Sequence, residues 1–238
     1  GQRALYVNNG ANNVSVGSSS MLDNTTGANN VAVGKHALYN NTTADNNTAV
    51  GDQALQGNTT GTANVAVGMT ALWGNTTASN NIGIGQQAGY SNTTGTRIIA
   101  IGTNAYDDSD TENDNIAIGY NSLGLSTTAS YNVAVGHQAL VANTTGTDNV
   151  AIGRASLQAN TTASENTAVG QGSLEANTTG DDNTAVGHAA LGSNTTASNN
   201  TAVGFSAGDA LTTGVNNIFL GSDFYNCDCY IKIAILLK

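Results

Sequence analysis

Hydrophobic and polar residues alternate in short segments that recur at a constant interval along the chain. The segment Asn30–Gly34 reads Asn-Val-Ala-Val-Gly, and its glycine returns every 17 residues from Gly17 to Gly221. Alternating β-branched and small residues predict a short strand in each segment. A fixed period of this length is typical of a solenoid, in which each repeat stacks on the one before it. The 238 residues thus divide into 17-residue repeats, whose positions are numbered 1 to 17 with this glycine last.

The two faces of the predicted strand differ in size. Positions 14 and 16 carry Val, Ile or Thr in nearly every repeat, whereas position 15 is mostly Ala or Gly. We expect the branched side chains to fill the inside of the coil. A column kept this small indicates close approach of another backbone, so we expect it to contact other copies of the chain. The alanines assigned to this oligomer interface are Ala32, Ala49, Ala66, Ala134, Ala151 and Ala185.

The rest of the repeat predicts a second strand and a polar turn. Positions 3 and 4 usually read Ala-Leu or Ser-Leu, as in Ala37-Leu38, and we interpret them as a strand whose Leu meets the Val/Ile face. Positions 7 to 9 read Asn-Thr-Thr, as in Asn41-Thr42-Thr43. Identical Asn side chains one repeat apart predict a hydrogen-bonded ladder. The same triplet matches the N-glycosylation acceptor, but we favour the ladder.

Repeat 7 (Thr103–Gly119) departs from the pattern. It lacks the Leu at position 4 and lacks Asn-Thr-Thr at positions 7 to 9. It carries five carboxylates between residues 107 and 114. Carboxylate oxygens bind Ca²⁺, although the spacing matches no known calcium loop and the glycine of such a loop is missing. A Ca²⁺ site at 107–114 and a solvated acidic loop are therefore both open.

Residues that break the repeat are also the candidates for ligand recognition, because the ladder positions are set by stacking. Aromatic rings beside carboxylates can stack on and hydrogen-bond to a sugar or a basic protein patch. The predicted ligand-binding residues are Tyr106, Asp107, Asp108, Asp110, Glu112, Asp114, Tyr120 and Tyr131.

Composition narrows the classes of function. The net charge is −10 with six Lys plus Arg, which disfavours nucleic acid and an anionic membrane surface as partners. The longest apolar run, Ile231–Leu237, is interrupted by Lys232 and is too short to span a membrane. Cys227 and Cys229 are interpreted as free thiols or as cross-links between chains.

Catalytic chemistry is not expected. His137 and His188 both occupy position 1, three repeats and hence about 14 Å apart at the usual strand spacing, so they cannot share a metal within one chain. No nucleophile with a base and an orienting group stands out from the repeats. We therefore expect a protein that is not an enzyme and has no cofactor beyond the possible Ca²⁺.

The segments Asn132–Gly136 and Asn149–Gly153 resemble the head repeats of trimeric autotransporter adhesins. The longer form, with Ala-Leu and Asn-Thr-Thr-Gly, is similar to repeats of phage tail fibres and related bacterial surface proteins. The resemblance covers residues 1–221, although the adhesin head repeat is usually shorter than the one found here. It implies a left-handed parallel β-roll with two strands per repeat and three chains side by side as a homotrimer.

The resemblance also sets the expected function. It implies an extracellular fibre head or shaft, on a cell surface or a virion, that attaches to a glycan or protein of a host or neighbouring cell or to matrix. The alternatives are a purely structural filament or spacer and an ice- or surface-binding array of Thr columns. We expect residues 1–221 to form one β-roll, and 222–238, which keep none of the consensus, to cap the stack or begin another segment.

Overall fold

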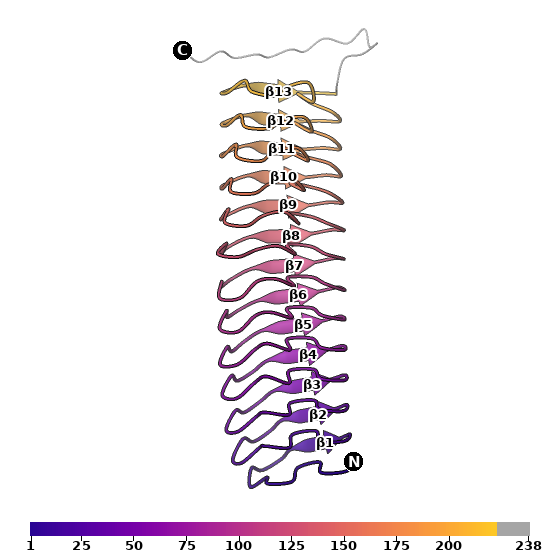
Figure 1. The fold of residues 1–238 in the computed structure, drawn as a ribbon. Coiled ribbons are helices and arrows are strands. Elements are labelled where there is room, and N and C mark those ends of the chain that lie inside the picture. The colour runs from indigo at the N-terminus through magenta and orange to yellow at the C-terminus, as the bar shows by residue number, and fades with distance from the viewer. Residues whose placement is uncertain (223–238) are drawn as a thin grey trace. The chain divides into compact units, whose positions relative to one another are not determined.

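The computed structural model describes residues 1–222 and is an all-β parallel solenoid in which each repeat forms one turn (Figure 1). The chain forms two compact units, Gly1–Asn121 and a second that begins at Ser122, and each is described by itself. Each turn contributes one short strand. The strands of the first unit are β1 (Val14–Val16), β2 (Val31–Val33), β3 (Thr48–Val50), β4 (Val65–Val67), β5 (Ile82–Ile84), β6 (Ile99–Ile101) and β7 (Ile116–Ile118). Those of the second are β8 (Val133–Val135), β9 (Val150–Ile152), β10 (Thr167–Val169), β11 (Thr184–Val186), β12 (Thr201–Val203) and β13 (Ile218–Leu220).

Successive strands within each unit pair in parallel and in register. Val31 lies beside Thr48, and Val150 lies beside Thr167, so every residue stacks on its equivalent one repeat later. The predicted period of one repeat per turn is confirmed.

A glycine ends each strand because there is no room for a side chain. Gly136 has φ of 142°, and a Cβ built on it would lie 2.4 Å from the carbonyl oxygen of Gly153 in the next turn. The same close approach recurs at most of the other position-17 glycines. This backbone contact explains why the glycine is the most constant residue of the repeat.

The interior is lined by small residues from the strand and by Leu from the opposite wall. Ala at position 15 and Leu at position 4 are fully buried. Leu72 crosses the interior to the strand, since a Cβ on Gly83 would lie 2.7 Å from its Cγ. The expectation that Val and Ile fill the coil is therefore wrong: the interior is so narrow that a Leu from the other wall leaves space only for Ala or Gly.

Positions 3 and 4 do not form a second strand. His36 and Leu38, at positions 2 and 4 of repeat 3, have φ of 55° and 53°, which is the left-handed region and not a strand conformation. This conformation lets the backbone bond to both neighbouring turns. The amide of His36 donates to Ser18 O at 3.0 Å, and that of Leu38 donates to Ala54 O at 3.0 Å.

Two columns of buried Asn hold successive turns together. The predicted ladder at position 7 is confirmed: Nδ2 of Asn58 donates to Oδ1 of Asn41 at 3.0 Å and to Gly61 O at 2.9 Å. A second ladder lies at position 13, where Oδ1 of Asn30 accepts the backbone N–H of Asn47 at 2.9 Å. All nine Asn of the glycosylation triplets are fully buried, so in the folded chain they serve as ladder residues.

The predicted terminal segment falls almost wholly outside the described residues. Only Ser222 of the segment 222–238 is described, and Cys227 and Cys229 are not. Among residues 1–222, the structure contains no helix with the length and apolar character needed to cross a membrane.

Candidate functional site

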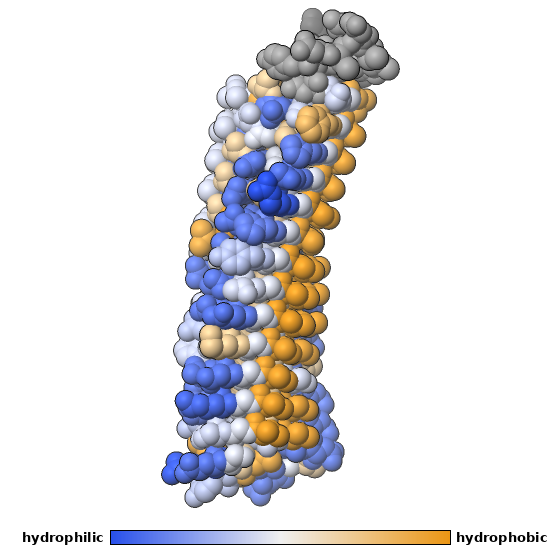
Figure 2. All heavy atoms as spheres, turned by 90° about the vertical axis from the view of Figure 1, so that its right-hand side faces the viewer, coloured by the Kyte–Doolittle hydropathy of each residue, from blue (hydrophilic) through white to orange (hydrophobic). Residues whose placement is uncertain are grey.

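The outward side chains of positions 14 and 16 form a mostly apolar surface in each unit, called here the outer Val/Ile face, in which four turns carry Thr at position 14. Figure 2 shows these residues as a hydrophobic band. They are exposed or half-buried; Val16 in the first unit is 55% exposed and Val203 in the second is 41% exposed. Monomeric soluble proteins seldom expose apolar surface continuously, so this face is the candidate site of interaction.

The six alanines predicted at the oligomer interface are all fully buried inside the single chain: Ala32, Ala49, Ala66, Ala134, Ala151 and Ala185. Their side chains pack in the interior with the Leu column and cannot contact another chain. The assignment of the two strand faces is therefore reversed, and the surface open to another molecule is the outer Val/Ile face.

Repeat 7 places two of its predicted binding residues in the interior. Tyr106 is fully buried and Glu112 is 4% exposed. The hydroxyl of Tyr106 donates to Oε2 of Glu112 at 3.3 Å, and Asn115 Nδ2 donates to the same hydroxyl at 3.0 Å. Burial raises the pKa of the Glu112 carboxyl and, together with the charge of Glu112, raises the pKa of the Tyr106 hydroxyl. These two residues belong to the core and offer nothing to a ligand at the surface.

This buried pair accompanies a break in the position-7 ladder. Tyr106 stands where most repeats have Leu, Ser109 where most have Asn, and Glu112 where they have Gly or Ala. Ser109 lacks the amide that would continue the ladder, and Oδ1 of Asn92 in the preceding turn has no hydrogen-bond partner among the described residues. Tyr106 and Glu112 are thus buried in the turn where the ladder amide is missing.

The other carboxylates of repeat 7 have separate surroundings. Asp110 accepts a hydrogen bond from the hydroxyl of Thr93. Asp114 is paired with the exposed Arg97 guanidinium at 2.5 and 2.7 Å, which lowers the pKa of that carboxyl. Burial, and next the neighbouring Asp108, raise the pKa of Asp107. Over residues 1–222 no three His, Cys, Asp or Glu side chains are grouped to hold a metal ion, so the carboxylates of 107–114, where a Ca²⁺ site was left open beside a solvated acidic loop, are not brought together as a set.

The two remaining predicted binding residues lie on the surface. Tyr120 is 50% exposed and belongs to the first unit, and Tyr131 is 60% exposed and belongs to the second. With Tyr106 and Glu112 buried, repeat 7 does not present the combined aromatic and acidic patch that its sequence suggested.

An aromatic row at position 5 was not among the predicted binding residues, which were chosen because they depart from the repeat in and next to repeat 7. It consists of Tyr39, Gln56, Trp73 and Tyr90, from four consecutive turns. The rings of Trp73 and Tyr90 are stacked with centroids 5.1 Å apart and planes 9° from parallel. Nε1 of Trp73 donates to Oε1 of Gln56 at 3.1 Å. The signal was present in the sequence as three aromatic residues spaced by whole repeats.

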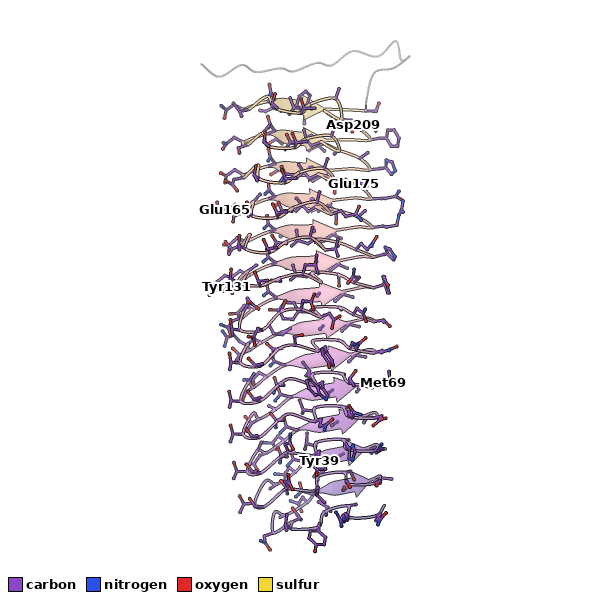
Figure 3. All side chains as sticks on the ribbon, viewed as in Figure 1. Tyr39, Met69, Tyr131, Glu165, Glu175 and Asp209 are labelled. Atoms are coloured by element: carbon purple, nitrogen blue, oxygen red, sulfur yellow. The ribbon has the colours of Figure 1, made fainter. Side chains whose placement is uncertain are left out.

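A column of carboxylates in the second unit was also missed. Asp148, Glu165 and Asp182 occupy position 12 of three consecutive turns, and Glu165 lies at the edge of the coil in Figure 3. The charge of Asp182 is the largest cause that raises the pKa of Glu165. The column is an exposed acidic surface, consistent with the excess of negative charge in the composition.

Comparison with known proteins adds no relative: no family model, curated protein or solved structure matches the chain.

Proposed function

We propose that this chain is the head or shaft of an extracellular attachment fibre, on a cell surface or a virion, in which three copies pack side by side. The observation that carries the proposal is the outer Val/Ile face, because it repeats at every strand and is left uncovered by the chain itself. The likeness of the repeats to those of trimeric adhesin heads and phage tail fibres supports the trimer, and implies a left-handed coil.

The energetics of one turn favour such an association. Each typical turn buries one Leu and a few Ala, which is a thin core for a whole repeat of ordered backbone. Most of the Val, Ile and Thr side chains at positions 14 and 16 are partly exposed, and covering their exposed surface contributes about 1 kcal/mol for each turn of each chain. Summed over the turns of a solenoid, this contribution is of the order needed to offset the usual cost of bringing chains together.

Packing through the outer Val/Ile face leaves the opposite wall of each chain free. The wall that carries Leu at position 4 would point away from the three-fold axis and toward solvent. Any ligand site on it would be present three times, so weak contacts at single sites would be strengthened by avidity.

The trimer is tested by placing charges on the outer Val/Ile face. We expect Val135→Glu combined with Val169→Glu to convert a trimer into monomers in multi-angle light scattering, with an unchanged β-sheet circular dichroism signal. The control is Thr145→Glu with Thr162→Glu, which alters exposed residues of the polar turn. A monomeric unmodified chain would refute the trimer.

Attachment is tested separately, by measuring binding of the purified chain to cells and to extracellular matrix. Binding that exceeds that of a control variant with rearranged surface residues supports the proposal that the chain is a fibre head. The alternative is a structural spacer, which the near-identical hydrogen bonding of successive turns favours. A well-folded trimer that binds no cell and no matrix would make the spacer the better proposal.

A further inference from the structure

We propose that the aromatic row of Tyr39, Gln56, Trp73 and Tyr90 is a binding site for a neutral polysaccharide strand. This inference rests on the proposed attachment function and names the site and the ligand class. The four residues stack along one wall, as the backbone shows: the amide of Asn40 donates to Gln56 O at 3.1 Å, and that of Gly57 donates to Trp73 O at 3.0 Å.

The other repeats show which side chains the fold accepts at position 5. In other turns this column contains Leu, Asp, Gly, Val, Gln and Glu, at Leu22, Asp107, Gly124, Val141, Gln158, Glu175, Gly192 and Asp209. A position that tolerates glycine and charged residues places no demand for aromatic rings on the fold. The clustering of two Tyr and one Trp in four consecutive turns therefore calls for a reason other than stability.

The row is accessible both in the chain and in the proposed trimer. Trp73 is 37% exposed, and Tyr39, Gln56 and Tyr90 are half-buried. Position 5 follows the buried Leu of position 4, whose side chain crosses the interior toward the strand. The row accordingly lies on the wall opposite the outer Val/Ile face. Figure 3 labels Tyr39, the first residue of the row.

The chemistry of the row suits a saccharide. Ring surfaces pack on the C–H groups of sugar rings, while the phenol hydroxyls, the indole N–H and the Gln56 amide can exchange hydrogen bonds with sugar hydroxyls. None of the four carries a positive charge, and the net charge of −10 repels sulphated or sialylated glycans. Parallel stacking repeats these groups about every 4.8 Å, so a polymer of neutral sugars can make similar contacts at successive turns.

The experiment uses Trp73 as its own reporter, because it is the single tryptophan of the chain. The full chain is mixed with cellulose, chitin, mannan and β-glucan, as soluble oligosaccharides and as insoluble polymers. We expect at least one of them to shift the Trp73 emission to shorter wavelength, to protect it from acrylamide quenching and to retain the chain in a pull-down. If none of these sugars binds, the proposal is wrong.

The variants Trp73→Gln and Tyr90→Gln place in the row a residue that position 5 already contains elsewhere. Each is expected to weaken binding about tenfold, the loss of one aromatic contact, and the double variant to abolish retention. Tyr131→Asn removes an exposed ring outside the row, and Glu175→Gln alters position 5 in the second unit; neither should change binding. Unchanged binding by the folded double variant would overturn the proposal.

Two outcomes separate this inference from the proposed function. If the unmodified chain attaches to cells and the double variant attaches equally well, the aromatic row is not the site, while attachment stands. If the double variant loses attachment but periodate oxidation of the cell-surface glycans has no effect on the unmodified chain, the row binds a protein and the polysaccharide proposal fails.

Discussion

Replacing Asn47 with alanine tests how much one rung of the position-13 ladder contributes to stability. Nδ2 of Asn47 donates to Gly61 O at 2.9 Å, and its Oδ1 accepts the backbone N–H of Asn64 at 2.9 Å. In the alanine variant Gly61 O keeps its hydrogen bond from Asn58, whereas the buried N–H of Asn64 loses its acceptor. A buried unsatisfied N–H costs about 1–3 kcal/mol, and the loss of the hydrogen bond from Asn47 Nδ2 to Gly61 O costs about 1 kcal/mol net. We therefore expect the free energy of unfolding to fall by about 2–4 kcal/mol.

The neighbouring residue supplies the control. Asn46 is exposed and has φ of 62°, and Ala63 occupies the same position one turn later with φ of 57°. We expect Asn46→Ala to cost about 1 kcal/mol or less, from the weaker tolerance of alanine for the left-handed region. Urea unfolding followed by circular dichroism compares the two variants, and hydrogen exchange shows whether the amide of Asn64 is selectively exposed. Equal losses for both variants, or a protected Asn64 amide in Asn47→Ala, would refute this account of the ladder.

Two further predictions concern the strand-ending glycine and the buried carboxyl. Gly136→Ala would place a Cβ 2.4 Å from Gly153 O, and it should lower the free energy of unfolding in urea by more than about 3 kcal/mol. Its control is Gly172→Ala, at position 2, where other turns contain alanine; this variant should cost far less. Similar costs for the two variants would contradict the close approach of the backbone at Gly136. For Glu112, whose pKa is raised in the folded chain by burial, the folded state binds its proton more tightly, so stability is greatest below the unfolded pKa of about 4.3 and falls as pH rises through the raised pKa. Glu112→Gln should remove this slope above about pH 4 and be more stable than the unmodified chain at neutral pH. Parallel pH profiles of the two proteins would count against a buried, proton-binding Glu112.

The period and the ladder were predictable from sequence because each depends on a residue that recurs at a fixed place. Gly17 and its equivalents mark the turn, and Asn41 and its equivalents form the ladder. Alternation along a strand, by contrast, identifies two faces without saying which is inside. That choice depends on the width of the interior, and here Leu72 and its equivalents from the other wall leave room only for alanine or glycine.

The second predicted strand failed for a different reason. Leu38 adopts a positive φ that its own propensity disfavours, and only the hydrogen bonds to the turns on either side make that conformation favourable. The buried Tyr106 and Glu112 were misplaced on the surface because a polar residue at an inward position looks like a loop residue when its partner is not known. The aromatic row was visible in the sequence as a column, but the departures in repeat 7 were the more prominent signal.

The positive φ values have a consequence for how the coil is built. A typical repeat holds three non-glycine residues in the left-handed region, such as His36, Leu38 and Asn46, at a cost of about 1–2 kcal/mol each. A repeat without a neighbour gains no inter-turn hydrogen bonds to offset that cost, so we expect an isolated turn to stay unfolded. Growth then resembles polymerisation from a nucleus: once the first few turns have formed, the last of them is the template on which the next repeat folds. Folding time would be set by that nucleus and would change little with the number of repeats added after it.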